Sequence, residues 1–191
     1  MNHFEHKRIC VYLNDVFEAQ TAHDPHAVVL YETKIEWDLP DLRGHGPDIA
    51  VIFDVKERKN WSVFDVAEEE TYPTLIIEVT VPRTRELDSE DKVDEYELAG
   101  VDYYVVIDTG DPESSHERDY SLFGCQMTEN GYQPMKPNEH GWLWLEPVNV
   151  WIGLRGNSVE CYDQAGQRIE NYVEIREAYR QLKAEAEIEA R

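Results

Sequence analysis

Glu78 is a single carboxylate inside the apolar run 73–82, which a proline bounds at each end. Alternation along a β-strand puts Ile76, Glu78 and Thr80 on one face of this run, so the carboxylate emerges among apolar neighbours. A glutamate in such surroundings is rarely buried unless a cation, a metal ion or hydrogen-bond donors accompany it. The run therefore predicts a core strand with a functional carboxylate. The alternative is an edge strand that leaves Glu78 in water.

Asp48 stands directly before a second apolar run, residues 49–53, and follows the turn-rich stretch 44–47. If the two runs form neighbouring strands, Asp48 and Glu78 can lie across from one another, and they repel unless a cation lies between them. Hard divalent cations such as Mg²⁺ are held by one or two carboxylates together with water and phosphate oxygens. The pair therefore indicates metal-assisted hydrolysis of a phosphodiester.

Lys92 is the candidate for a third catalytic role. It falls on a predicted helix over residues 88–99, which Gly100 ends, and it lies four residues after Asp88 and four before Tyr96. An ammonium group near the two carboxylates would stabilise charge that develops on the phosphate or position the attacking water. An ordinary ion pair between Asp88 and Lys92 on the helix surface is equally consistent with this spacing.

Three further polar residues could support the site. His45 could bind a metal or move protons, although a histidine in a Gly-His-Gly turn is more often simply exposed. Glu32 could supply another carboxylate, and Lys34 on the same strand face gives it an equally simple partner. Thr80 shares the strand face of Glu78, but a neutral hydroxyl supplies no positive charge.

The surrounding pattern predicts an α/β fold. A helix is expected over residues 4–17, and strands are expected at 28–37, 49–53, 73–82 and 103–108. Strand, helix and strand over residues 73–108 form a βαβ unit, which implies two parallel strands joined by a right-handed crossover. Short segments at 120–127, 142–145, 148–154 and 159–162 then predict a C-terminal antiparallel extension.

The formal charge of −22 disfavours a general nucleic-acid-binding surface, because non-specific affinity comes mainly from neutralised phosphates. Basic residues nevertheless flank the central strand in sequence. They could form a local rim for phosphate contacts: Lys56, Arg58, Lys59, Arg83 and Arg85. The alternative for these residues is an ordinary solvated surface.

Length and composition indicate a globular chain of 191 residues, 41% of them hydrophobic, in which no stretch approaches the ~20 apolar residues of a membrane span. Cys10, Cys125 and Cys161 are odd in number and widely spaced, which argues against a disulfide framework or a zinc site. The N-terminus also lacks the apolar region of a secretory signal. The chain is therefore expected in a reducing cytoplasm.

The last segment, residues 169–191, is predicted to be a helix separate from a domain over residues 1–168. Its apolar side chains fall at alternating spacings of three and four residues: Tyr172, Ile175, Tyr179, Leu182 and Ala186. Such a seam is typical of a coiled coil, so we expect a homodimer, which would suit an enzyme that cuts both strands of a duplex. The alternative is a helix packed on its own domain.

The order of these motifs resembles a known family. Gly46-Pro47-Asp48, followed by Glu78 within a strand, resembles the PD-(D/E)xK signature of the restriction-endonuclease-like nucleases. The resemblance narrows to the bacterial Uma-two family, whose members are classed as endonucleases, and covers residues 47–108. The matching positions are Pro47, Asp48, Glu78, Val79, Pro82, Thr84, Asp88, Lys92, Tyr96, Gly100, Val101 and Tyr104.

The resemblance implies a restriction-endonuclease-like central mixed β-sheet flanked by helices, with DNA as the substrate. It also implies Mg²⁺ or Mn²⁺ held by Asp48, Glu78 and the backbone carbonyl of Val79. In the superfamily a lysine stands two residues after the glutamate. Here that position is Thr80, and the Uma-two pattern offers the helical Lys92 as a substitute.

A competing hypothesis is a catalytically silent member that uses the nuclease fold as a binding or assembly module. The acidic charge and the absence of a lysine two residues after Glu78 favour it. Titration with a divalent metal, followed by cleavage assays on DNA and RNA, separates the two hypotheses.

Overall fold

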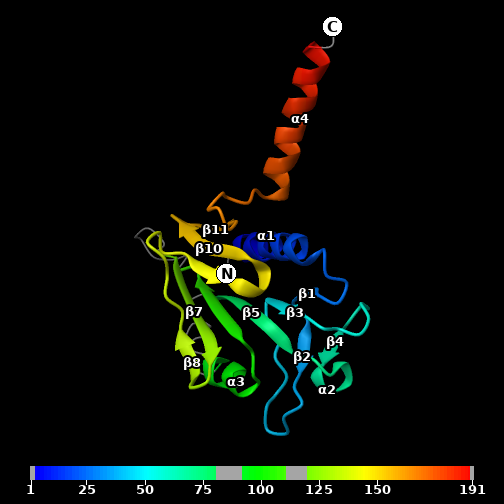
Figure 1. Ribbon diagram of the computed structural model, residues 1–191, viewed down its shortest axis with the longest axis vertical. Coiled ribbons are helices and arrows are strands. Elements are labelled where there is room, and N and C mark those ends of the chain that lie inside the picture. The colour runs from blue at the N-terminus through cyan, green and yellow to red at the C-terminus, as the bar shows by residue number, and fades with distance from the viewer. Residues whose placement is uncertain (1–2, 81–91, 111–119, 190–191) are drawn as a thin grey trace.

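A six-stranded mixed sheet with the strand order β1-β3-β5-β6-β7-β8 forms the centre of the fold (Figure 1). The computed structural model describes residues 3–80, 92–110 and 120–189. The strands of this sheet are β1 (Val28–Tyr31), β3 (Ile49–Ile52), β5 (Pro73–Thr80), β6 (Tyr103–Asp108), β7 (Ser121–Thr128) and β8 (Gly131–Pro134). In the two central strands every residue except Thr74 is buried, as their continuous apolar runs predict.

Strands β5 and β6 run parallel, while the other neighbouring pairs in the sheet are antiparallel. Between them in the chain lies α3 (Lys92–Leu98), and Gly100 follows this helix with a φ of 79°, which favours glycine. The predicted βαβ unit is therefore confirmed. Because the pair is parallel, the C-terminal ends of both strands lie at the same edge of the sheet.

One face of the sheet is covered by α1 (His3–Thr21), over which a smaller antiparallel sheet lies (Figure 1). That sheet has the order β11-β10-β9, with β9 (Leu143–Leu145), β10 (Val150–Arg155) and β11 (Ser158–Tyr162), and the 3-10 helix η2 (Glu146–Val148) between β9 and β10. The apolar stripe predicted for the first helix is buried in a core that both sheets share: Ile9, Leu13, Val16 and Phe17. The predicted antiparallel extension is therefore confirmed.

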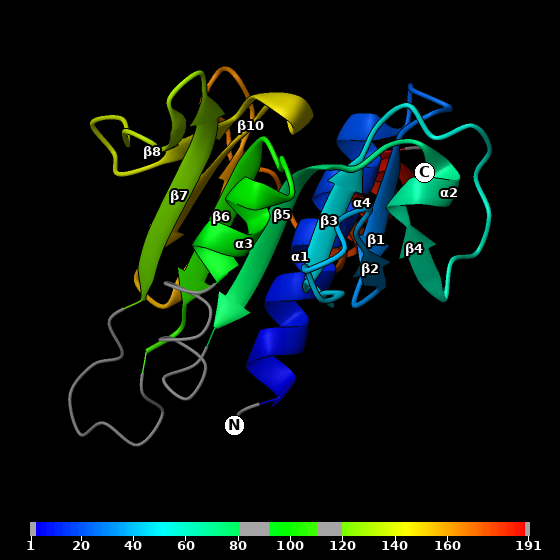
Figure 2. The ribbon, with the colours of Figure 1, turned by 90° about the horizontal axis from the view of Figure 1, so that it is seen from below.

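The opposite face carries α3 and a parallel pair of short strands, β2 (Lys34–Glu36) and β4 (Val63–Asp65) (Figure 2). Their buried side chains, such as Phe64 and Tyr96, form a second core with the central strands. Alternation along β5 divides this strand between the two cores, because Ile76 packs in the second core while Leu75 and Ile77 pack beneath α1. The predicted assignment of the two faces is thus confirmed.

The strand predicted over residues 28–37 is broken in two. Glu32 has a φ of 46°, a left-handed conformation in which the chain turns out of the central sheet. As a result β2 pairs with β4 rather than with the central sheet. The four-residue helix α2 (Val66–Glu69), which Asp65 caps through the N–H groups of Ala67 and Glu68, was also not expected.

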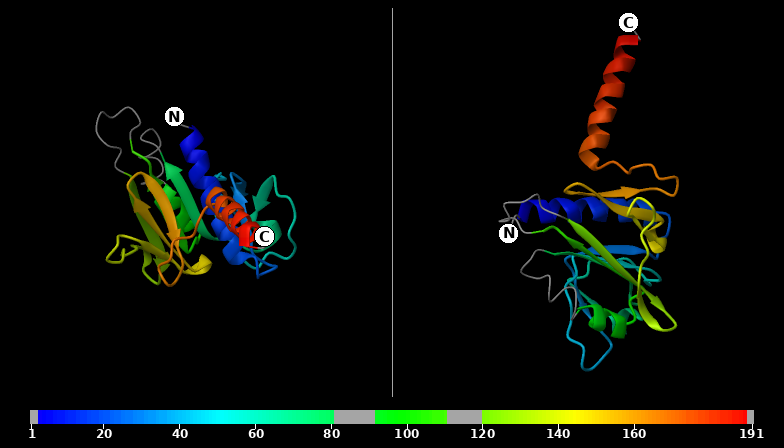
Figure 3. Two further views of the ribbon diagram at one scale, coloured as in Figure 1. Left: turned by 90° about the horizontal axis from the view of Figure 1, so that it is seen from above. Right: turned by 90° about the vertical axis from the view of Figure 1, so that its left-hand side faces the viewer.

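Helix α4 (Tyr172–Glu189) projects away from the two sheets (Figures 1 and 3). Its predicted seam stays in solvent, with exposed fractions of 65% for Tyr172, 59% for Tyr179 and 65% for Leu182. Packing of this helix on its own domain, the alternative considered from sequence, therefore does not occur. Among the helices that the structure describes, none has the length and apolar character needed to cross a membrane.

Candidate active site

The start of β3 and the end of β5 bring the two predicted carboxylates together. Ile49 pairs with Ile77 across these antiparallel strands, so Asp48, one residue earlier, lies opposite Glu78. The Oδ2 atom of Asp48 accepts a hydrogen bond of 2.7 Å from the backbone N–H of Val79. This bond fixes the Asp48 side chain against the strand that carries Glu78.

Glu78 is 5% exposed and lies on a central strand, so the alternative of an edge strand in water is wrong. Two side chains of α3 contact it. Lys92 Nζ donates to Glu78 Oε1 over 2.8 Å, and the Tyr96 hydroxyl donates to the same oxygen over 3.0 Å. Because Lys92 and Tyr96 are four residues apart, one face of the helix presents both groups to the carboxylate. Glu78 thus has the cation and the donor that its apolar surroundings require.

The pairing of Lys92 with Asp88, which the spacing left open, falls outside the described residues. The same holds for the predicted phosphate contacts Arg83 and Arg85. Lys92 itself is turned toward the sheet, since its Nζ is within hydrogen-bonding distance of Glu78.

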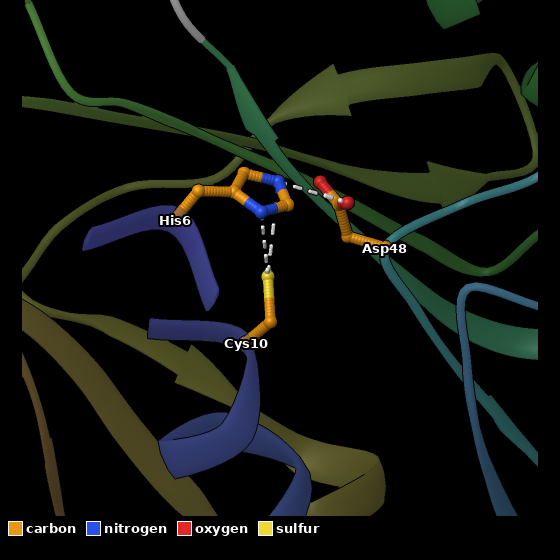
Figure 4. Close-up of side chains that lie close together, drawn as sticks. All are labelled: His6, Cys10 and Asp48. Atoms are coloured by element: carbon orange, nitrogen blue, oxygen red, sulfur yellow. Dashed lines mark hydrogen bonds and ion pairs between the residues drawn. The ribbon is translucent and has the colours of Figure 1, made fainter. Parts of the chain in front are cut away.

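A histidine and a cysteine of α1 lie beside Asp48 (Figure 4). His6 Nε2 is 3.0 Å from Asp48 Oδ1, and Cys10 Sγ lies 3.8 and 3.9 Å from the two ring nitrogens of His6. The hydrogen bond to Asp48 raises the pKa of His6, against the lowering effect of burial. The charges of Glu32 and Glu78 act in the same direction as Asp48, which favours the imidazolium form of His6.

Sequence reasoning missed both of these residues. Their spacing of four residues places His6 and Cys10 on one face of α1, and Cys10 belongs to the buried stripe of that helix. That spacing is the signal that could have directed attention to them. Burial and the nearby charges of Asp48, Glu32 and Glu78 raise the pKa of the Cys10 thiol, which favours the protonated form.

Glu32 adjoins the carboxylate pair through its backbone, because its N–H donates to the Asp48 carbonyl over 3.1 Å. Its side chain is exposed and accepts a hydrogen bond of 3.0 Å from the Tyr31 hydroxyl. Lys34, the partner considered from sequence, instead pairs with Glu36. Glu32 therefore adds negative charge beside the site without an ion pair to Lys34.

Thr80 is fully buried at the end of β5. Its backbone carbonyl accepts hydrogen bonds from the N–H and the hydroxyl of Thr109, at 3.1 and 3.0 Å. The Thr80 hydroxyl has no hydrogen-bond partner among the described residues, a set that does not include the adjoining segment 81–91. Within the described chain, Thr80 therefore gives Glu78 neither charge nor a hydrogen bond.

His45 is 5% exposed, so the expectation of an exposed turn histidine is wrong. Its Nδ1 accepts a hydrogen bond of 2.7 Å from Trp37 Nε1, and its Nε2 is 2.6 Å from Glu95 Oε2 on α3. Burial lowers the pKa of His45, against the raising effect of Glu95, and the Trp37 bond requires an unprotonated Nδ1. His45 therefore links the turn before Asp48 to the helix that carries Lys92.

The basic residues between β3 and β5 lie at the other end of the sheet. This segment follows the end of β3 and leads into the start of β5, whereas Asp48 and Glu78 stand at the opposite ends of these strands. Each basic side chain has a local partner: Lys56 pairs with Glu70, Lys59 with Glu69, and Arg58 donates to the Asp24 carbonyl. Lys56, Arg58 and Lys59 thus do not form the expected rim around the carboxylates.

The arrangement can bind a hard divalent cation through oxygen atoms. Asp48 is 15% exposed and Glu78 6% exposed in their side chains, so both are largely shielded while solvent still reaches the pair. A residue in a strand directs its N–H and C=O to the same side, so the Val79 carbonyl faces the side on which its N–H meets Asp48. Two carboxylates and a carbonyl are ligands that Mg²⁺ or Mn²⁺ accepts.

Comparison with known proteins adds a family match. The sequence model of the Uma2 family, described as "Putative restriction endonuclease", matches residues 1–174. Among solved structures, the chain matches one titled as a putative nuclease belonging to DUF820 from Anabaena variabilis ATCC 29413. The two share 16% identity with a TM-score of 0.49, over 74% of this chain and 72% of that chain. No curated protein matches the chain.

Proposed function

Since the chain belongs to the Uma2 family of putative restriction endonucleases, we propose that it is an endonuclease that hydrolyses DNA phosphodiesters with Mg²⁺ or Mn²⁺. The observation that carries this proposal is the placement of Asp48 opposite Glu78, with Lys92 on the same carboxylate. Acidic pairs of this kind occur elsewhere without a metal. Here, however, the acidic pair occurs in a chain of a nuclease family, and Lys92 donates to an oxygen of Glu78.

We assign the metal to Asp48, Glu78 and the Val79 carbonyl. The three groups come from the adjoining ends of β3 and β5. Strand β3 begins at Ile49, one residue after Asp48, and the Asp48 side chain accepts the hydrogen bond from the Val79 N–H. When bound, the ion would polarise the scissile phosphate and make an attacking water more acidic. Its charge would also offset the repulsion between the two carboxylates.

Lys92 and Tyr96 position and balance Glu78. The Lys92 side chain is 21% exposed, and the contact of its ammonium with Glu78 keeps a positive charge at the point where a phosphate would approach the carboxylates. A charge held there stabilises negative charge that develops on a pentavalent phosphorus. The Tyr96 hydroxyl donates to the same Glu78 oxygen and restricts the rotation of the carboxylate. His6 performs the corresponding task for Asp48.

The catalytically silent alternative rests on the net charge of −22, which opposes binding of a polyanion. A bound divalent ion and the local charges of Lys92 and His6 offset this repulsion at the site itself. Binding of substrate should therefore depend on the metal.

The decisive experiment is a cleavage assay on circular double-stranded DNA, linear single-stranded DNA and RNA, with and without Mg²⁺ or Mn²⁺. We expect cleavage of DNA that a chelator abolishes and that added metal restores. Tight metal binding without cleavage of any substrate would instead support the binding or assembly module. Equal cleavage in the presence of excess chelator would contradict the metal-dependent mechanism.

We further propose that residues 1–168 are the nuclease domain and that residues 169–191 join two copies of the chain. The seam of α4 is exposed along its length and repeats with the period of a coiled coil, so an identical helix is a matching partner. The three buried, unpaired cysteines fit the reducing cytoplasm that we propose as the location.

Replacing Leu182 with Glu should separate the dimer, because a charge then stands in the middle of the apolar seam. Light scattering should give the wild-type chain twice the monomer mass of 22.3 kDa and the Leu182→Glu chain the monomer mass. Gln181→Glu adds the same charge one residue away from the seam and should remain dimeric. A wild-type monomer at micromolar concentration would rule out assembly through this helix.

A further inference from the structure

Asp48 and the side chains beside it make up a second set of ligands, which shares only Asp48 with the oxygen set of Asp48, Glu78 and Val79. Among the described residues, the imidazole of His6, the thiol of Cys10 and the carboxylate of Asp48 offer ligand atoms that all lie within 4.8 Å of one another (Figure 4). Nitrogen, sulfur and oxygen ligands together select thiophilic ions such as Zn²⁺ or Co²⁺ over Mg²⁺.

The distances fit a tetrahedral ion. With bonds of about 2.0 Å to nitrogen and oxygen and about 2.3 Å to sulfur, tetrahedral zinc separates its ligand atoms by about 3.3 to 3.6 Å. His6 Nε2 stands 3.0 Å from Asp48 Oδ1 and 3.9 Å from Cys10 Sγ, on either side of that spacing. Because all three ligand atoms lie within 4.8 Å of one another, rotations of these side chains can bring them around one ion.

The local field also favours a divalent cation. The charges of Asp48, Glu32 and Glu78 all act on both His6 and Cys10, so a cation held between these two side chains lies in the field of three carboxylates. His6 and Asp48 are each 15% exposed, which gives a hydrated ion a path from solvent, whereas Cys10 lies in the core at the inner end of the group. Binding would form metal bonds to the Cys10 sulfur and the His6 nitrogen, and the protons that these two atoms carry would be released to solvent.

We propose that His6, Cys10 and Asp48 form a binding site for a thiophilic divalent ion, of which Zn²⁺ is the main candidate. The site shares Asp48 with the proposed Mg²⁺ site. When zinc holds the Asp48 carboxylate beneath α1, that carboxylate is no longer available to Mg²⁺. Zinc would therefore act as an inhibitor of the nuclease. Only this inhibitory consequence rests on the proposed function, while the binding site itself does not.

Cobalt is the probe, because a thiolate bound to Co²⁺ gives a charge-transfer absorption in the near ultraviolet that nitrogen and oxygen ligands do not give. The full-length wild-type chain, without Mg²⁺, should develop this band until one equivalent of Co²⁺ is bound, and Zn²⁺ should remove it. Cys10→Ala should abolish the band. Cys125→Ala and Cys161→Ala are matched controls, since both replace a buried free thiol outside the group, and they should retain it.

Direct zinc titration gives the magnitude. Cys10→Ala and His6→Gln should each weaken Zn²⁺ binding by about 100-fold or more, since loss of even an outer-shell partner costs about 10–100-fold. In the cleavage assay, zinc inhibition is measured against each protein's own Mg²⁺-dependent rate. This inhibition should be weaker in both variants than in the wild-type chain. The absence of a thiolate band at stoichiometric Co²⁺, or a band that survives Cys10→Ala in a folded protein, would overturn the proposal. A band without any cleavage activity would uphold the zinc site and count against the proposed nuclease alone.

Discussion

Glu78→Gln and Asp48→Asn are each expected to lower DNA cleavage by about 10³-fold or more. Lewis-acid stabilisation by a metal is worth several kcal/mol, and about 1.4 kcal/mol corresponds to a factor of ten in rate. Each amide keeps the shape of the acid but lacks the charge that holds the ion. Calorimetric titration should show weakened Mg²⁺ or Mn²⁺ binding in both proteins, in parallel with the lost activity.

Both variants should fold, although neither should be more stable than the wild-type chain. The sequence suggests that loss of one charge relieves repulsion between the two carboxylates. In the structure, however, each carboxylate already has a cationic partner, His6 for Asp48 and Lys92 for Glu78. Removing the charge of Glu78 takes an anionic partner from the partly buried Lys92. We expect the melting temperature to fall by a few degrees, since 1 kcal/mol corresponds to about 2–4 °C in a domain of this size.

Two amide substitutions at the other end of the sheet serve as controls. Asp54→Asn alters the exposed aspartate after β3, at the end opposite Asp48, and Glu68→Gln alters an exposed glutamate of α2. Both should retain metal affinity and cleavage. If Asp48→Asn and Glu78→Gln bound metal as tightly as these controls, the proposed metal site would be wrong.

Lys92→Ala should lower turnover by about 10² or more while metal binding survives. The ammonium contacts Glu78 in the free protein, so its loss removes positive charge from the site and also frees Glu78 from an ion pair. Metal affinity should therefore stay equal or increase while kcat falls. A purely structural ion pair would not give this combination of results. Lys56→Ala is the matched control, since Lys56 pairs with Glu70 at the far end of the sheet.

Thr80 supplies a further test of the same charge. Thr80→Val keeps the shape of a side chain whose hydroxyl has no partner among the described residues, so its effect on turnover should be mild. Adding Thr80→Lys to the Lys92→Ala protein restores a lysine on the strand face of Glu78. Partial recovery of turnover would support a shared requirement for charge. Full activity of Lys92→Ala alone would show that Lys92 has no catalytic role.

The local pattern of the sequence determined most of the elements and singled out the two carboxylates. A period of two assigned the faces of β5, the apolar runs marked the buried strands, and Gly100 marked the end of α3. The pairing of β3 with β5 and the reach of Lys92 to Glu78 were open possibilities in the sequence, and the structure has both. These features depend on residues close in sequence or on the simplest topology.

The tertiary structure alone decided what surrounds the carboxylates. His6 and Cys10 are some forty residues from Asp48 in the chain, and only the packing of α1 across the sheet brings them to it. Packing also buried His45 between Trp37 and Glu95, and it carried Lys56 to the far end of the sheet. Spacing along the chain does not encode such contacts, because they depend on how separate elements dock. The sequence thus determined which residues could do chemistry, and the docking of helices on the sheet decided which of them meet.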